Sequence, residues 1–114
     1  MKKLKMTLKK EWFNKIKSGE KKQEFREVKK YWIQRLCAVD SIFTKDFTDI
    51  VKFVPKKYNT VVFTNGYSKN SPKIEVNIET IELLKNITCP LGYGDFFVIN
   101  LGDVISNLDV EEQR

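Results

Sequence analysis

Histidine is absent from the 114 residues, and this absence excludes more chemistry than any other feature of the composition. Without an imidazole the chain has no Ser-His or Cys-His nucleophile, and it lacks the usual nitrogen ligands for zinc. Cysteine is nearly absent too. Cys37 and Cys89 are too few and too far apart for a disulfide framework or a zinc site, so we expect two reduced thiols. We therefore expect neither a metal nor a cofactor.

A long apolar run is also missing. No stretch approaches the roughly 18 to 20 apolar residues that span a bilayer, and the lysine-rich N-terminus lacks the apolar segment of a signal peptide. We therefore expect a cytoplasmic protein with no membrane partner. Repeats, linkers and low-complexity tracts are absent. The length then predicts a single domain over residues 1–106, followed by an acidic, frayed tail over residues 107–114.

Positive charge is abundant, and it is concentrated near the N-terminus. Residues 1–35 carry 13 Lys or Arg against 4 acidic residues, whereas the remainder carries 8 against 11. A basic region next to a slightly acidic one suits a polyanionic ligand such as a nucleic acid. The plainer interpretation is a well-solvated lysine surface.

Hydrophobic periodicity predicts an α+β protein with about five strands and two or three helices. The predicted strands cover residues 2–8, 21–28, 59–64, 73–84 and 95–101, and the predicted helices cover residues 9–18 and 29–36. Gly19 is expected to end the first helix. The continuous apolar run over residues 96–99 predicts a strand that is buried on both faces. Several antiparallel strands in so short a chain favour a small mixed β-barrel.

Residues 37–57 are too apolar for a bare loop. Phe43, Phe47, Ile50 and Val54 fit helical spacing, and Pro55 would end such a helix. We therefore predict a third helix here. If its apolar face were exposed, the segment would favour a small adaptor that contacts another protein.

Three ionisable residues are crowded where the first helix gives way to a strand: Lys21, Glu24 and Arg26. Arginine presents a planar fork that suits phosphate, and lysine acts as a movable point charge. Together they could hold a nucleotide phosphate while Glu24 orients the ribose or the base. The alternative is an ion pair on a strand face, which contributes little when it is exposed.

Aromatic and loop residues supply further candidates for a nucleic-acid site. Tyr31 and Trp32 are candidate stacking partners for unpaired bases, and the alternative for both is the core. Asn65-Gly66-Tyr67 begins a polar loop that also contains Lys69. This loop is either a plain turn or part of a binding surface, since loops on a rigid scaffold often carry binding residues.

Gly19, Lys21, Glu24 and Arg26 match the G-x-K-x-x-E-x-R signature of ASCH domains, which belong to the PUA-like superfold. The chain resembles this family over about residues 4–101. The order of a strand, a helix and then the signature agrees with the family. Two further blocks resemble small bacterial and phage members, namely residues 24–32 and residues 63–67 followed by Pro72.

The resemblance implies a PUA-like barrel with a cleft beside the signature, and a role in binding RNA or a nucleotide. Some members hydrolyse acetylated cytidine with the signature lysine and a threonine at the position of Glu24, and others are associated with ribonuclease activity. Because Glu24 replaces that threonine, the usual nucleophile is missing from its place. We therefore predict RNA or nucleotide binding. The alternative is a ribonuclease or an acetylcytidine-type amidohydrolase, with Lys21 and Glu24 as the catalytic pair.

Overall fold

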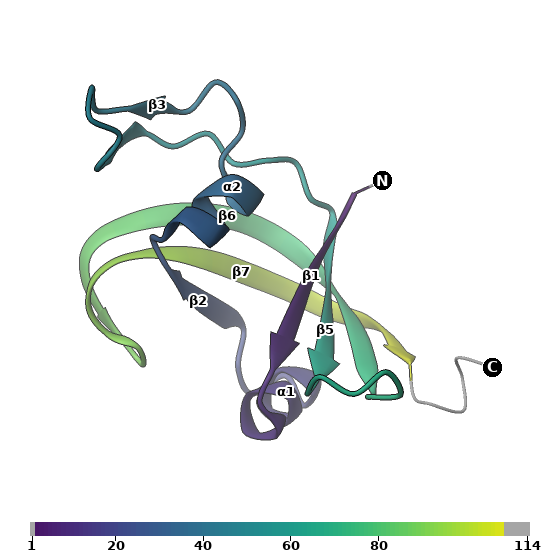
Figure 1. Ribbon diagram of the computed structural model, residues 1–114. Coiled ribbons are helices and arrows are strands. Elements are labelled where there is room, and N and C mark those ends of the chain that lie inside the picture. The colour runs from purple at the N-terminus through teal and green to yellow at the C-terminus, as the bar shows by residue number, and fades with distance from the viewer. Residues whose placement is uncertain (1, 109–114) are drawn as a thin grey trace. The chain divides into compact units, whose positions relative to one another are not determined.

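A computed structural model describes residues 2–108 (Figure 1). In chain order the elements are β1 (Lys3–Leu8), α1 (Lys10–Lys17), β2 (Gln23–Glu27), α2 (Lys30–Leu36), β3 (Ile42–Phe43), β4 (Ile50–Lys52), β5 (Thr60–Asn65), β6 (Lys73–Cys89) and β7 (Gly92–Leu108). All seven elements predicted outside residues 37–57 are present, with boundaries that differ by a few residues for most and by more for the two longest strands.

The predicted α+β class holds, but the predicted closed barrel is wrong. The five-stranded sheet has the order β1-β5-β6-β7-β2, and β3 and β4 form a separate two-stranded sheet. Within residues 2–108 no ladder joins β1 to β2, so the sheet stays open. Periodicity counts strands, but closure depends on strand tilt and on the stagger between neighbouring strands. Those quantities have no short-range signal in the sequence.

The chain divides into two compact units. Among the described residues, the first contains residues 2–24, 58–80 and 100–108, and the second contains residues 25–57 and 81–99. β6 and β7 contribute residues to both units. The prediction of a single domain stays a prediction.

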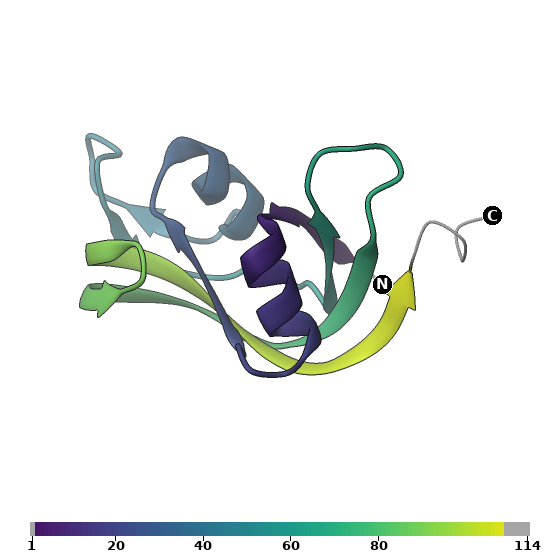
Figure 2. The same ribbon diagram turned by 90° about the horizontal axis from the view of Figure 1, so that it is seen from below.

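In the first unit β1 pairs in parallel with β5, and β5 pairs antiparallel with β6. Helix α1 contacts β1 and β5. Figure 2 shows this helix, and also the loop that joins β5 to β6. In β1 alternate residues are buried, as the period of two of a strand predicts. The buried apolar side chains of this unit are Leu4, Met6, Leu8, Phe13, Ile16, Val61, Phe63, Ile74, Val76 and Leu101.

The second unit contains α2, the β3–β4 hairpin and the ends of β6 and β7. The apolar run of β7 is buried as predicted, with Phe96 at 4% exposure and Phe97, Val98 and Ile99 at 0%. The Phe97 ring lies 5.3 Å from the ring of Phe53, between their centres. The proline and glycines over residues 89–94 predict a turn-rich crossing. β6 continues to Cys89 and β7 begins at Gly92, so this connection is a short hairpin turn.

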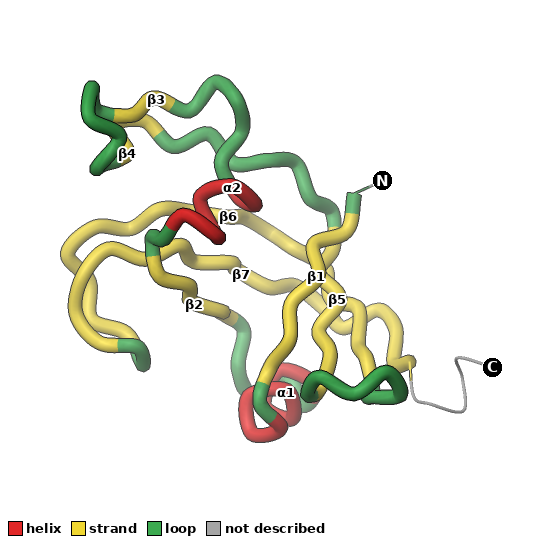
Figure 3. Tube along the Cα trace, in the orientation of Figure 1, coloured by secondary structure: helices red, strands yellow, loops and turns green. Residues whose placement is uncertain are grey.

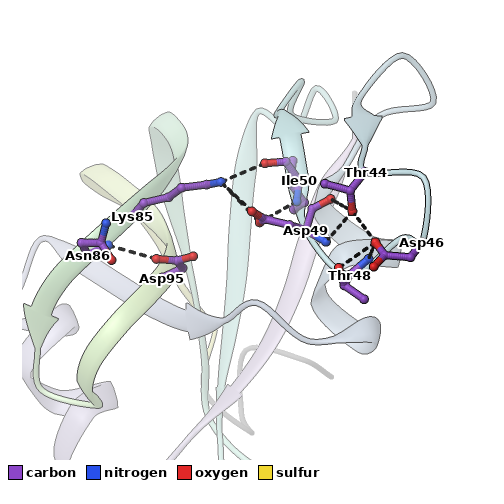
Figure 4. Close-up of polar contacts among 8 residues, drawn as sticks. All are labelled: Thr44, Asp46, Thr48, Asp49, Ile50, Lys85, Asn86 and Asp95. Carbon is purple, nitrogen blue, oxygen red and sulfur yellow. Dashed lines mark hydrogen bonds and ion pairs between the residues drawn. The ribbon is translucent and has the colours of Figure 1, made fainter.

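The helix predicted within residues 37–57 is wrong. This segment consists of turns and the short strands β3 and β4, as the loop colouring in Figure 3 makes clear. The Asp46 carboxylate accepts hydrogen bonds from the Thr44 hydroxyl at 2.8 Å and the Thr48 hydroxyl at 2.7 Å (Figure 4). Side chains of this kind compete with the helical backbone for hydrogen bonds. Phe47, which the helical pattern required in the core, has a φ of 58° and is 77% exposed.

The C-terminal strand is longer than predicted. β7 continues through Val104 and Ile105 to Leu108, so the first two residues of the predicted frayed tail belong to a strand. The rest of that tail, residues 109–114, lies outside the described residues.

Candidate functional site

The first unit brings Lys21 and Glu24 together. Helix α1 ends at Lys17, and Gly19, two residues later, has a φ of +83°, which is strained for any residue with a side chain. The turn is closed by hydrogen bonds from the Gly19 amide to the Ile16 carbonyl and from the Lys21 amide to the Lys15 carbonyl, both 3.0 Å long. Gly19 therefore turns the chain after the helix, as predicted, and Lys21 lies beside the end of the helix.

The Lys21 ammonium is held by two neighbours. Its Nζ donates a hydrogen bond to Glu24 Oε1 at 2.8 Å, and the two side chains are only 16% and 5% exposed. The same Nζ lies 4.5 Å from the centre of the Trp12 ring. An ammonium over an indole face is attracted by the ring quadrupole, and more strongly when water is excluded. Lys21 is thus a positioned cation rather than a mobile surface lysine.

Glu24, and not Phe25, is the fully buried residue of β2. The alternation over residues 21–28 predicts that Phe25 points into the core, but Glu24 is 4% exposed while Phe25 is half-buried. A carboxylate is withdrawn from water only where charged and hydrogen-bonding partners compensate its lost hydration. Lys21 supplies that compensation, and no pattern of alternating polarity could reveal it.

A pocket of about 150 Å³ opens beside Lys21 in the first unit. Its walls come from the end of α1, the turn after it, β6 and β7. The lining residues are Ile16, Lys17, Ser18, Gly19, Lys21, Lys22, Val76, Leu101, Gly102, Asp103 and Val104. We call this the Lys21 pocket. A cavity of about this volume can hold a single six-membered ring, so it has room for one ring or one phosphate group.

Charge in the Lys21 pocket is mainly positive. Three of its lining residues are lysines and one, Asp103, is acidic. Lys17 and Lys22 are exposed, and neither makes an ion pair with any other residue between positions 2 and 108. Lys21 is already paired with Glu24, so Lys17 and Lys22 provide the uncompensated charge toward a ligand.

Arg26, Tyr31 and Trp32 belong to the second unit. The guanidinium carbon of Arg26 lies 5.2 Å from the centre of the Trp32 ring, and the Trp32 and Tyr31 rings meet edge to face at 4.9 Å. Tyr31 is 55% exposed, while Trp32 is half-buried. Lys21 and Glu24 thus belong to the first unit, and Arg26 with the two aromatic residues belongs to the second. That all the signature residues line one cleft stays a prediction.

The loop candidates lie together at one end of the first unit. Asn65 is the last residue of β5, and Gly66 has a φ of +85°, which permits the turn. The Asn65 and Gly66 amides bond to the carbonyls of Pro72 and Leu8, both at 3.0 Å. Tyr67 is 95% exposed and Lys69 is exposed as well. The backbone of the loop is thus anchored, while the side chains of Tyr67 and Lys69 face solvent.

Sequence reasoning missed part of the Lys21 pocket. Lys17 and Lys22 flank Gly19, and two extra lysines beside the signature were the available signal. The helical spacing of Trp12 predicts a place in the core, but Trp12 is half-buried and lies beneath Lys21. The dipeptide Gly102-Asp103 predicts a turn, but these residues continue β7 and line the pocket.

A second buried carboxylate also escaped prediction. The alternation over residues 73–84 predicts that Glu75 on β6 lies on an exposed face, but it is 8% exposed. Its carboxylate accepts a hydrogen bond from the Thr60 hydroxyl at 2.7 Å and another from Lys3 Nζ at 3.1 Å. The Thr60 hydrogen bond, with a smaller contribution from Lys3, lowers the pKa of Glu75. Because Thr60 is itself 3% exposed, its hydrogen bond to Glu75 satisfies two buried polar groups.

The described residues bring together no group of three or more potential metal-ligating Cys, Asp or Glu side chains. Cys37 and Cys89 are free thiols, and burial raises the pKa of Cys37. Between residues 2 and 108 neither helix has the length and apolar character needed to cross a membrane. A scan against protein-family models, a search of curated proteins and a search of solved structures each found no match to this chain.

Proposed function

We propose that this protein binds RNA or a nucleotide, and that an anionic group of the ligand enters the Lys21 pocket. The observation that carries the proposal is a pocket of about 150 Å³ whose lining has three lysines and one acidic residue. Phosphate is the anion that a nucleotide presents, and lysine is a common partner for it. The concentration of positive charge in residues 1–35 supports the same ligand class.

The three lysines have different roles in this proposal. Lys17 and Lys22, which are exposed, attract the phosphate. Lys21 is held by Glu24 at 2.8 Å and by the Trp12 ring, so its position is set before the ligand arrives. An ammonium has three N–H donors, and those not used by Glu24 can serve a phosphate or base oxygen. Such preorganisation lowers the entropic cost of binding.

The size of the Lys21 pocket restricts what enters it. Pockets for complete small molecules usually measure about 300 to 1,000 Å³, whereas this one measures about 150 Å³. One phosphate or one base therefore occupies it, and the rest of the ligand lies on the surface outside. The resemblance of Gly19, Lys21, Glu24 and Arg26 to the ASCH signature supports RNA as the source of that group. We place this binding in the cytoplasm, where the thiols of Cys37 and Cys89 stay reduced.

Binding of a fluorescent single-stranded RNA to the double variant K17A/K22A tests the proposal. Its affinity should fall about tenfold or more, and the slope of log affinity against log salt should decrease by up to about two units, because up to two phosphate contacts are lost. The matched control is the double variant K9A/K10A, which removes the same number of positive charges from the exposed start of helix α1. If K17A/K22A binds as tightly as K9A/K10A, the Lys21 pocket is not the binding site.

A further inference from the structure

The second unit carries a row of planar cationic and aromatic side chains on α2 and the strand before it. The Arg26 guanidinium lies over the Trp32 ring at 5.2 Å, and the Trp32 and Tyr31 rings meet edge to face at 4.9 Å. The row continues with the Arg35 guanidinium, which lies 4.4 Å from the centre of the Tyr31 ring. We call Arg26, Trp32, Tyr31 and Arg35 the α2 ladder.

Packing within the second unit does not account for the positions of Tyr31 and Arg35, the exposed residues of the α2 ladder. Leu36 is the buried residue of α2, so the helix is anchored mainly through its C-terminal end. Tyr31 contacts both Arg35 and Trp32 and is still 55% exposed. A ring that its neighbours hold in place while much of its surface faces water is preorganised for a planar ligand.

The charge around the α2 ladder is complementary to a nucleic acid. Helix α2 contains Lys30 and Arg35 and no acidic residue. Lys30 is exposed and makes no ion pair with any residue in the described part of the chain, whereas Lys29 is paired with Glu27 at 3.3 Å. An acidic peptide would match this charge, but only nucleic acid adds planar bases, which stack on aromatic rings and on guanidinium planes.

We propose that the α2 ladder is a stacking site for an unpaired base of single-stranded RNA, with Tyr31 and Arg35 as the contacting residues and Lys30 beside a phosphate. The inference rests on the proposed function for the choice of RNA as the ligand. The stacking site goes beyond the proposed function because it requires single-stranded RNA whose bases are accessible. A duplex, whose bases already stack on one another, offers no free face to Tyr31.

The two tryptophans of the chain allow this site to be observed separately. Trp12→Phe leaves Trp32, within the α2 ladder, as the only tryptophan, and it preserves a ring beneath Lys21. Titration of this variant with an oligouridylate of about ten nucleotides, a length within the range of single-strand sites, should quench the emission of Trp32. Polyglutamate of similar charge should leave the emission unchanged. Quenching by polyglutamate to the same extent, or no quenching by the oligonucleotide, would overturn the proposal.

Substitutions in the W12F background test the contacting residues. Tyr31→Leu removes the ring and should weaken oligouridylate binding about tenfold, whereas Tyr31→Phe should bind as W12F itself does. Arg35→Lys keeps the charge and removes the guanidinium plane, so it should also weaken binding even if Y31L proves unstable. Melting temperatures measured in parallel identify a variant that has lost its fold. Unchanged affinity in folded Y31L, or in R35K, contradicts the stacking site.

The outcome also distinguishes this inference from the proposed function. K17A/K22A in the W12F background should lower the overall affinity and still allow oligouridylate at high concentration to quench Trp32. If K17A/K22A has no effect but the quenching depends on Tyr31, only the Lys21 pocket is rejected. If K17A/K22A weakens binding and Y31L does not, only the α2 ladder is rejected.

Discussion

Two ion pairs of this protein share the same chemistry and differ in their surroundings. In the first unit Lys21 and Glu24 lie 2.8 Å apart with side chains 16% and 5% exposed. In the second unit Lys85 and Asp49 lie 3.2 Å apart with side chains 42% and 54% exposed. Water solvates the second pair whether or not it forms, whereas Glu24 has little access to water and depends on Lys21. Similar distances therefore mean a structural requirement in one unit and a minor contact in the other.

The surroundings of Asp49 illustrate the same difference. Its carboxylate accepts hydrogen bonds from Lys85 and from the Ile50 amide, as Figure 4 shows, and these lower its pKa. The hydrogen bonds order the turn between β3 and β4. They do not compensate a charge withdrawn from solvent, because Asp49 is exposed.

Removing the buried carboxylate should have the largest effect. Glu24→Ala leaves the Lys21 ammonium half-buried without its partner, and such a loss typically costs about 3 to 5 kcal/mol in the free energy of unfolding. Urea denaturation at neutral pH measures it. The matched control is Glu20→Ala, four residues earlier, which removes an exposed acid. Equal free energies of unfolding for E24A and E20A would show that the comparison between the two pairs is mistaken.

Glu75 with Lys3 should give an intermediate effect, because the side chains of this pair are 11% and 47% exposed. The pKa of Glu75 is lowered in the folded protein, first by Thr60 and then by Lys3, from its ordinary value of 4.5. The unfolded chain therefore binds the proton first, and stability falls as the pH drops through and below that value. Urea midpoints measured between about pH 6 and pH 3 should fall less steeply in Glu75→Gln than in the unmodified protein.

Thr60→Val sharpens this test, because the Thr60 hydroxyl is the largest cause of the lowered pKa. Its pH profile should lie between those of E75Q and the unmodified protein. Parallel profiles for all three proteins would mean that Glu75 does not contribute to the acid dependence.

Breaking the exposed pair should have the smallest effect. Asp49→Asn removes the charge that Lys85 contacts, but both partners remain hydrated and the amide oxygen can still accept from the Ile50 amide. The urea midpoint should stay within the error of the measurement, at low and at high salt. Lys85→Gln is the complementary variant and should behave in the same way. A loss comparable with that of E24A would contradict the contrast between the two units.

Much of the local structure could be predicted because its signals lie within a few residues. The apolar positions that repeat every three or four residues predict α1, and Gly19 predicts its end. The run over residues 96–99 predicts a buried strand. The prediction of a helix within residues 37–57 was wrong for a local reason as well. The hydrogen bonds of Thr44, Asp46 and Thr48 outweighed a coincidental helical spacing of apolar residues.

The candidate site could be predicted only in part. The signature identified Lys21 and Glu24, and the structure joins them at 2.8 Å. The Lys21 pocket itself needed β6 and β7 to approach the end of α1, which brings Leu101 and Asp103 beside residues more than seventy positions earlier. Hydrophobic periodicity within a short stretch predicts neither which distant strands approach each other nor the volume of the pocket that they line.

The sequence alone determined the order of the elements outside residues 37–57, the turn at Gly19 and the positive charge beside it, because these depend on neighbouring residues. Only the tertiary structure decided that the sheet stays open, that Glu24 is buried in place of Phe25, and that Trp12 supports Lys21. The physical reason is that the cost of burying a charge depends on partners brought together in space. Lys21, three residues from Glu24, compensates the burial of the Glu24 carboxylate. Trp12 on the preceding helix helps to hold the Lys21 ammonium in place.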